Sequence, residues 1–196
     1  TETIVQLIAK SKRSKTIDKI IDAIFQIQGG YALVMLTQNS LIGVRDPYGI
    51  RPLVIGKLGK SYVLASETCA LDIIGAKFIR NVENGEIVLI ENEKLKSIKP
   101  FPLKKVRPCV FEYIYFSRPD SIIDNKTAYE HRKNIGKELA KENNIDADIV
   151  VPVPDSGNAA ALGFAQHLKM NFEHGLIRNH YVGRTFIEPS QKIRSL

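Results

Sequence analysis

The stretch VVPVPDSGNAAA, residues 150–161, predicts a strand that ends at two prolines and passes through a polar turn into a helix of small residues. This turn places backbone N–H groups, the Asp155 carboxylate and the Ser156 hydroxyl at the carboxyl end of the strand. Open α/β sheets bind ligands at that edge, and a helix N-terminus there favours phosphate or a phosphate-bound cation. The alternative is an ordinary strand-to-helix connection in which Asp155 or Ser156 caps the helix.

Strands and helices alternate around this turn. Helical character at residues 127–142, an apolar strand at residues 149–153 and a small-residue helix at residues 159–168 precede another short strand at residues 175–177. This alternation is typical of a parallel α/β domain, in which we expect the strand at residues 149–153 to be buried. Residues 179–196 combine glycine, proline, hydroxyl and basic side chains, and they predict a mobile loop.

The first half of the chain has a different pattern. Apolar residues at helical spacing predict helices at residues 3–7 and 17–27, with Thr16 as the cap of the second helix and the glycines at 29–30 as its end. Short strands at hairpin-like spacing follow, and they predict an antiparallel sheet. The strands are expected at residues 31–36, 41–45, 53–55, 62–65 and 86–90, with a short helix at residues 67–74.

Three prolines and several lysines at residues 99–108 interrupt both patterns. We therefore divide the chain into one domain at residues 1–100 and a second domain at residues 101–196. The sequence starts at Thr1, directly before a helical pattern, and ends at Leu196 after a basic polar run. Such ends favour an internal piece of a longer chain.

The 196 residues are 44% hydrophobic and 25% charged, as is typical of a soluble globular protein. The sequence has no signal peptide and no apolar run near the roughly 20 residues that span a bilayer, so we expect no membrane association and a cytoplasmic location. A net charge of +7 suits anionic ligands such as phosphates. Nucleic acid is not an expected partner, because the sequence lacks zinc-finger spacing and aromatic RNA-binding motifs.

Four motifs, in order along the chain, resemble one known family. They are DPYGIRPL at residues 46–53, ASET at residues 65–68, CVFEYIYFSRPDS at residues 109–121 and YVGRTFI at residues 181–187. With these motifs the whole chain resembles the amidophosphoribosyltransferases, also called glutamine phosphoribosylpyrophosphate amidotransferases. Polar residues at turns and strand ends more often make structural hydrogen bonds than catalyse, so we assign to the scaffold Asp46, Arg51, Ser66 and Glu67.

The resemblance implies a two-part enzyme of purine synthesis. Residues 1–100 would be the C-terminal portion of an α+β glutaminase of the N-terminal-nucleophile type, with antiparallel sheets and helices. Residues 101–196 would be the N-terminal portion of an α/β type I phosphoribosyltransferase, so that both parts are truncated. In the full-length enzyme, a pentosyltransferase, ammonia released from glutamine displaces pyrophosphate from phosphoribosyl pyrophosphate. The product is 5-phosphoribosylamine, in the first step of de novo purine synthesis.

The nucleophile of this family is a cysteine at the mature N-terminus, and the resemblance places it upstream of Thr1. Neither Cys69 nor Cys109 can replace it, because the mechanism needs the free α-amino group of the same residue to activate the thiol. We therefore expect no catalytic residue in this fragment, and we expect the fragment alone to be inactive.

The resemblance also implies substrate-binding residues. Ser156 matches a position associated with the Mg²⁺ of bound phosphoribosyl pyrophosphate, and Asp155 shares its turn. Tyr181, Arg184 and Thr185 match a flexible loop that resembles a lid over the phosphoribosyl site. Closing such a lid excludes water, which would compete with ammonia for the reactive sugar carbon.

Cys109 matches the position at which some members of the family bind a [4Fe-4S] cluster, whereas other members keep this cysteine without a cluster. A structural thiol is the alternative at this position. The implied partners are glutamine, phosphoribosyl pyrophosphate and purine nucleotides as feedback inhibitors, and the full-length protein is expected to be a homo-oligomer. The competing interpretation of the whole chain is a non-catalytic, nucleotide-binding regulatory module of the phosphoribosyltransferase type.

Overall fold

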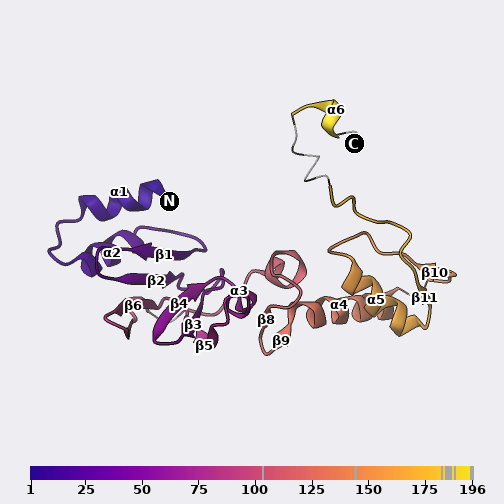
Figure 1. The fold of residues 1–196 in the computed structure, drawn as a ribbon, viewed down its shortest axis with the longest axis horizontal. Helices are drawn as coiled ribbons and strands as arrows, with labels where there is room; N and C mark the ends of the chain where they lie inside the picture. The colour runs from indigo at the N-terminus through magenta and orange to yellow at the C-terminus, as the bar shows by residue number, and fades with distance from the viewer. Residues whose placement is uncertain (103, 144, 182, 184–186, 188, 195–196) are drawn as a thin grey trace. The chain divides into compact units, whose positions relative to one another are not determined.

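The computed structural model divides the chain into two compact units, Thr1–Glu112 (unit 1) and Tyr113–Leu196 (unit 2). The assignment of residues 1–100 and 101–196 to two catalytic domains stays a prediction. Among the helices of the described residues, none combines the length and the apolar character that crossing a membrane requires. The structure describes residues 1–102, 104–143, 145–181, 183, 187 and 189–194 (Figure 1).

The described residues of unit 1 form helices and two antiparallel sheets (Figure 1). In chain order the elements are α1 Glu2–Lys10, α2 Thr16–Ile24, β1 Ala32–Leu36, β2 Leu41–Arg45, β3 Val54–Leu58, β4 Ser61–Ala65, α3 Thr68–Ile73, β5 Lys77–Asn81, β6 Ile87–Glu91 and β7 Lys94–Ile98. One sheet has the strand order β1-β2-β6-β7, and the other has the order β4-β3-β5. The antiparallel sheet expected from the short strands is therefore confirmed, as two sheets rather than one.

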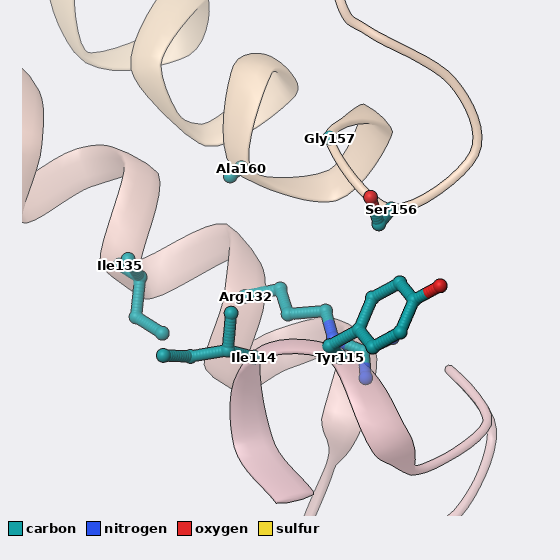
Figure 2. A pocket seen from close by; sticks show the side chains of 7 residues that line it. All are labelled: Ile114, Tyr115, Arg132, Ile135, Ser156, Gly157 and Ala160. Carbon is teal, nitrogen blue, oxygen red and sulfur yellow. The ribbon is translucent and has the colours of Figure 1, made fainter. Parts of the chain in front are cut away.

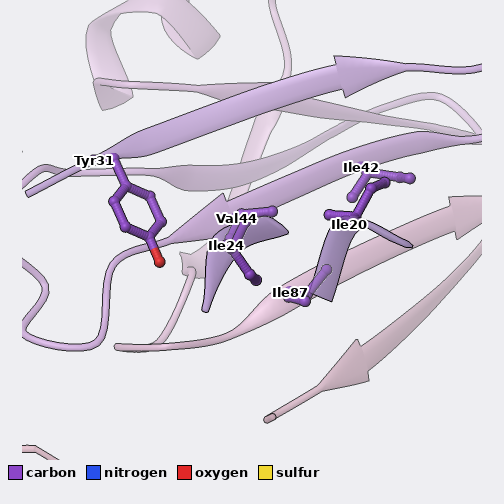
Figure 3. Packing of buried hydrophobic residues seen from close by; sticks show 6 residues of the cluster. All are labelled: Ile20, Ile24, Tyr31, Ile42, Val44 and Ile87. Carbon is purple, nitrogen blue, oxygen red and sulfur yellow. The ribbon is translucent and has the colours of Figure 1, made fainter. Parts of the chain in front are cut away.

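Helix α2 packs on the larger sheet of unit 1. Its apolar residues recur at helical spacing, so that Ile20 and Ile24 lie on one face and are buried. Figure 3 shows these two side chains beside Val44 of β2 and Ile87 of β6, in one apolar cluster. Unit 1 thus has a helical layer over the first sheet.

A second apolar layer lies between the two sheets. Successive strand residues point to opposite faces, so Val88 lies on the side of β6 away from α2 and packs with Ile55 of β3. The neighbouring Val54 points to the outer face of the second sheet and packs with Leu71 of α3. Unit 1 is consequently a four-layer arrangement of helix, sheet, sheet and helix.

The sequence patterns missed some local features of unit 1. Strands β5 and β7 were not expected, because their sequences KFIRN and KLKSI carry polar residues and only β-sheet pairing makes them strands. Thr16 is the first residue of α2 and makes no side-chain cap hydrogen bond, so its expected capping role is wrong. The helix also ends at Ile24, before the predicted residue 27.

Unit 2 begins with a turn of π-helix whose first residue belongs to unit 1. The elements are η1 Glu112–Phe116, β8 Ile122–Ile123, β9 Lys126–Thr127, α4 Ala128–Glu142, β10 Ile149–Val150, α5 Asn158–Leu168, β11 Asn171–Phe172 and α6 Gln191–Arg194. Strands β10 and β11 pair in parallel, with α5 between them in the sequence. This pairing is a single short parallel crossover, and the α/β phosphoribosyltransferase fold of this part stays a prediction.

Two expectations for the strands of unit 2 are wrong. Only Ile149 and Val150 pair within the predicted strand 149–153. Pro152 is buried there, but the strand as a whole is not, since Ile149 is 49% and Val153 is 70% exposed. The next strand lies at Asn171–Phe172 and not at residues 175–177. A parallel sheet is buried only when further strands and helices cover it, and the described residues pair just two short strands here.

Glycines bring α4 and α5 into backbone contact. A Cβ atom on Gly136 of α4 would lie 1.8 Å from the carbonyl oxygen of Ala160, and a Cβ atom on Gly163 of α5 would lie 1.9 Å from that of Lys133. Any other residue at these positions would push the two helices apart. Glycine at both positions therefore sets the distance between the helices, and α4 carries α5 and the turn that precedes it.

Candidate site at the Ser156 turn

The turn between β10 and α5 is closed by its own backbone. The amide of Gly157 donates to the carbonyl oxygen of Val153 at 3.0 Å, and the amide of Asn158 donates to that of Asp155 at 3.3 Å. Gly157 is the N-cap of α5, and this cap makes no side-chain hydrogen bond. The interpretation of Asp155 or Ser156 as the helix cap is therefore wrong, and the Ser156 hydroxyl is not used in that way.

Asp155 and Ser156 have different surroundings. The Asp155 carboxylate accepts a hydrogen bond from Nη1 of Arg178 at 2.9 Å, in an exposed ion pair. Ser156 instead lines a pocket of about 260 Å³ together with residues of η1, α4 and α5. The residues that line this pocket are Ile114, Tyr115, Arg132, Ile135, Ser156, Gly157 and Ala160 (Figure 2).

The pocket has apolar walls and a cation in one of them. Figure 2 shows Ser156 at the end of the turn, Tyr115 and Ile114 on η1, and Ile135 on α4. Arg132 of α4 is only 6% exposed, and its positive charge favours an anionic ligand. A phosphate-bearing ligand with an apolar or planar portion suits this combination of side chains.

Arg132 also holds the pocket wall in place. Its Nε donates to the carbonyl oxygen of Tyr113 at 2.9 Å, and its Nη2 donates to that of Ser117 at 2.6 Å. These two carbonyl groups bracket the pocket-lining residues Ile114 and Tyr115. The sequence analysis did not predict a role for Arg132. The spacing of small residues could have indicated one, because Arg132 lies four residues from both Ala128 and Gly136, on the buried face of α4.

The start of α4 is fixed by a capping box. The Thr127 hydroxyl accepts from the amide of Glu130 at 3.1 Å, and the Glu130 carboxylate accepts from the amide of Thr127 at 2.9 Å. This backbone hydrogen bond lowers the pKa of Glu130 below its ordinary value. Next to it, Nε2 of His131 lies 2.9 Å from the carbonyl oxygen of Ile123, which ties the β8–β9 hairpin to the helix. The element that carries Arg132 is thus well anchored.

The other predicted site residues do not gather around the pocket in the described structure. The Tyr181 side chain is fully exposed, and its amide donates to Oδ1 of Asn179 at 3.0 Å. Arg184 and Thr185 lie outside the described residues, so the lid stays a prediction. Cys109 is half-buried, and the described residues contain no group of three His, Cys, Asp or Glu side chains that could hold a metal ion.

The DPYGIRPL motif of unit 1 forms a buried hydrogen-bond network. The Asp46 carboxylate is fully buried and accepts from the amides of Tyr31, Tyr48, Ile50 and Arg51 at 2.9–3.3 Å. A carboxylate that is saturated by backbone donors holds a turn and has no free lone pair for a substrate. This is what the sequence analysis expected of a scaffold residue at Asp46.

A second buried carboxylate of unit 1 is Glu86. It accepts from both Nη atoms of Arg80 at 2.7 and 2.8 Å and from the amide of Glu83 at 2.7 Å. Burial acts to raise the pKa of Glu86, but the hydrogen bonds from Arg80, Ser97 and Glu83 outweigh it and lower the pKa below its ordinary value. Asp46 and Glu86 thus both serve the fold.

Comparison with known proteins identifies relatives along the whole chain. A family model described as a glutamine amidotransferase domain matches residues 1–72. The amidophosphoribosyltransferase of Rhizobium etli is 55% identical over 200 residues, which cover 100% of this chain and 40% of the relative. That of Bacillus subtilis is 47% identical over 195 residues, which cover 99% of this chain and 41% of the relative. The chain is homologous to the amidophosphoribosyltransferases.

A solved structure has the same fold. It is the glutamine phosphoribosylpyrophosphate amidotransferase of B. subtilis complexed with ADP and GMP, which matches with a TM-score of 0.90 and 46% identity. The match covers 100% of this chain and 43% of that chain, so the sequence spans about two fifths of the length of these amidophosphoribosyltransferases. The resemblance inferred from four motifs is confirmed, as are the antiparallel sheets and helices expected for the glutamine amidotransferase part.

Proposed function

We propose that the protein makes 5-phosphoribosylamine from phosphoribosyl pyrophosphate and glutamine-derived ammonia, in the first step of de novo purine synthesis. The observation that carries this proposal is the homology to amidophosphoribosyltransferases, which continues from unit 1 through unit 2. In this proposal unit 1 belongs to the glutaminase, and unit 2 is the first portion of a type I phosphoribosyltransferase. The expected location is the cytoplasm, and the expected assembly is a homo-oligomer.

The phosphoribosyl site is proposed at the Ser156 turn. The turn follows the first strand of a parallel β10–α5–β11 crossover, which is where such sheets bind phosphorylated ligands. Ser156 does not cap α5, and the buried Arg132 supplies positive charge beside it. Asp155 would hold the turn through Arg178, and Tyr181, Arg184 and Thr185 would close over the bound substrate.

Mg²⁺ and an iron–sulfur cluster fit the described residues differently. Mg²⁺ binds mainly through water and substrate phosphates, so one hydroxyl such as that of Ser156 suffices as a protein ligand, and the ion would neutralise the pyrophosphate. A [4Fe-4S] cluster needs about four thiolates. The described residues offer Cys109 without companion ligands, so they do not by themselves fit a cluster, and we assign it no role.

Purine nucleotides are proposed as regulatory ligands. The B. subtilis homologue was solved with ADP and GMP bound. The pocket beside Ser156 combines an aromatic ring, apolar walls and a cation, which are the features that a nucleotide requires of its site. We therefore expect purine nucleotides to inhibit this protein as well.

The test is product formation by the full-length gene product with either nitrogen donor. The Ser156→Ala variant should lower kcat/KM for phosphoribosyl pyrophosphate about tenfold with glutamine and with ammonia, because both routes share the phosphoribosyl site. Glutamate release in the absence of phosphoribosyl pyrophosphate should be unchanged. Ser14→Ala, at an exposed serine of unit 1, is the matched control and should behave as wild type.

Two results would contradict the proposal. One is the absence of phosphoribosylamine from the wild-type protein with both nitrogen donors, alongside measurable nucleotide binding. That result would favour the non-catalytic regulatory module. The other is an equal effect of Ser156→Ala and Ser14→Ala on phosphoribosyl transfer, which would remove Ser156 from the site.

A further inference from the structure

One side of the Ser156 pocket is not fixed by burial. Ile114 and Tyr115 of η1 line this side, which is called the η1 wall below, and they are 44% and 54% exposed. A single helical turn with so little buried apolar surface has low local stability by itself. The η1 wall therefore depends on polar contacts for its position.

Several of these contacts meet at Tyr113, the residue directly before the η1 wall. Its carbonyl oxygen accepts from Nε of Arg132 at 2.9 Å. Its hydroxyl donates to Oδ2 of Asp124 at 2.5 Å. Its ring also meets that of His131 edge-on, with the two centroids 5.0 Å apart. The main chain and the side chain of Tyr113 are thus both held, and all of these partners belong to unit 2.

The acceptor of the Tyr113 hydroxyl lies at the tip of the β8–β9 hairpin. Asp124 and Asn125 have left-handed backbone conformations, with φ of 47° and 64°, which Asp and Asn adopt more readily than most residues. The hairpin is tied to α4, since Nε2 of His131 lies 2.9 Å from the carbonyl oxygen of Ile123. A turn of defined shape consequently presents the Asp124 carboxylate to Tyr113.

A displacement of Tyr113 would change the pocket in two ways. It would move the η1 wall, and it would withdraw the carbonyl oxygen that orients the buried guanidinium of Arg132. A hydroxyl that donates to a carboxylate makes a stronger hydrogen bond than two neutral groups do. The contact between Tyr113 and Asp124 is therefore able to hold both parts of the pocket in place.

We propose that Tyr113 is a positioning residue whose hydroxyl, held by Asp124, keeps the η1 wall and Arg132 in the geometry that binds a phosphate-bearing ligand at the Ser156 pocket. This inference rests on the proposed function, and it gives the β8–β9 hairpin a role in ligand affinity without a ligand contact of its own. When the hydroxyl contact is lost, the binding-competent arrangement is less populated, and the apparent affinity falls by the same factor.

The experiment measures phosphoribosylamine formation from ammonia by the full-length gene product, at increasing concentrations of phosphoribosyl pyrophosphate. Tyr113→Phe removes the hydroxyl and keeps the ring and the carbonyl contact with Arg132. It should raise KM about fivefold, equivalent to about one net hydrogen bond. It should leave kcat within about twofold of wild type, because the pocket wall binds substrate and transition state equally. Equilibrium dialysis with phosphoribosyl pyrophosphate and Mg²⁺ should show the same rise in Kd.

Variants of Asp124 test the same contact from its other side. Asp124→Gly removes the acceptor, and glycine tolerates the left-handed backbone, so KM should rise as it does in Tyr113→Phe. The double variant should raise KM no further, since both changes remove one contact. Asp124→Asn keeps an acceptor oxygen and should stay within about twofold of the wild-type KM.

Two matched controls separate this role from a general structural defect. Asn125→Gly makes the same change at the neighbouring turn residue, and Tyr129→Phe removes a tyrosine hydroxyl from α4. Both should keep the wild-type KM. Thermal unfolding identifies any variant that has lost its fold, and Asp124→Gly carries the test if Tyr113→Phe does not fold.

The inference is overturned by a wild-type KM in a folded Tyr113→Phe or Asp124→Gly variant, or by a fall in kcat at unchanged KM. An equal rise in KM in either control overturns it as well. The failure of the proposed function has a separate signature, because a wild-type protein that makes no phosphoribosylamine from ammonia lacks the transfer site itself, and the inference then fails with it. An active wild type, with KM raised in Tyr113→Phe and Asp124→Gly but not in the controls, supports the positioning role.

Discussion

The two units differ in where they place their apolar side chains. Unit 1 buries apolar clusters in three layers between its helices and antiparallel sheets, although Leu36 at 83% and Ile73 at 69% are exposed. In unit 2 several apolar side chains near the parallel strands are exposed, including Ile149 at 49%, Val153 at 70% and Ile177 at 83%. Antiparallel strands joined by short turns close a core locally, whereas a parallel crossover needs more strands and helices on both sides.

The units also differ in how they use charged groups. In unit 1 the buried carboxylates of Asp46 and Glu86 are saturated by hydrogen bonds and hold turns. In unit 2 the buried Arg132 stands in the wall of a pocket beside Ser156. In unit 1, a buried acid in a recognisable motif is therefore a structural residue. In unit 2, a buried arginine that belongs to no recognised motif lines the candidate site.

The largest effect that would test this contrast comes from the helix contact in unit 2. Gly136→Ala places a methyl group where the Ala160 carbonyl oxygen lies 1.8 Å away, and backbone cannot move aside as a flexible side chain does. We expect the variant to destabilise unit 2 by about 3 kcal/mol or more, the upper range of overpacking. Hydrogen exchange should report faster exchange in α4 and α5 and unchanged protection in the sheets of unit 1.

The matched control lies on the exposed face of the same helix. Asn134→Ala changes a solvent-facing residue of α4 and should leave exchange in both units as in wild type. Equal loss of protection in unit 1 and unit 2 after Gly136→Ala would show that the two units unfold together. In that case the two units would differ in how they pack their apolar side chains but not in their resistance to unfolding.

Much of this fold is readable from sequence because local patterns determine it. The strand Leu41–Arg45 has the predicted bounds, and the helix Asn158–Leu168 begins one residue before its prediction. Strands β5 and β7 were not predicted, because pairing with neighbouring strands, and not their own sequence patterns, makes them strands. The expected burial of the strand at residues 149–153 failed because burial depends on neighbours that the pattern does not contain.

The candidate site was only partly predictable. Asp155 and Ser156 were found because the strand, turn and helix around them are contiguous in sequence. Arg132 lies in a distant helix and in none of the recognised motifs. Contacts between remote segments follow from tertiary packing, which one sequence does not encode as a visible pattern.

A smaller effect, specific to unit 1, is expected from the buried carboxylate of Glu86. Its pKa is lower in the folded state than the ordinary 4.5, so its stabilising contribution is present above about pH 4.5 and is lost as the pH falls through the folded-state pKa. At pH 7, Glu86→Gln should lower the free energy of unfolding by about 2 kcal/mol, the loss of charge-assisted hydrogen bonds. Urea unfolding at several pH values should show this difference shrinking in acid.

The corresponding control in unit 2 is Glu130, whose pKa is lowered by the capping-box hydrogen bond at an exposed position. Screening by water weakens such an interaction, so Glu130→Gln should change the acid dependence of unfolding less than Glu86→Gln does. A larger acid effect at Glu130 would contradict the assignment of the main acid-sensitive contact to unit 1.

The smallest effect concerns the Tyr31 hydroxyl, which is buried at the edge of the α2 cluster without a hydrogen-bond partner among the described residues (Figure 3). Burial, with the charge of Asp46 in support, raises the pKa of Tyr31 to about 12. Because an unpaired buried hydroxyl costs free energy, Tyr31→Phe should leave stability at pH 7 unchanged or raise it by up to about 1 kcal/mol. The unfolded chain ionises near pH 10, so wild type should also lose stability between pH 10 and about 12, and the variant should lose less. Urea unfolding at about pH 7 and pH 11 measures both effects. If Tyr31→Phe lowers the free energy of unfolding by about 1 kcal/mol or more at neutral pH, the Tyr31 hydroxyl has a hydrogen-bond partner and the prediction is wrong.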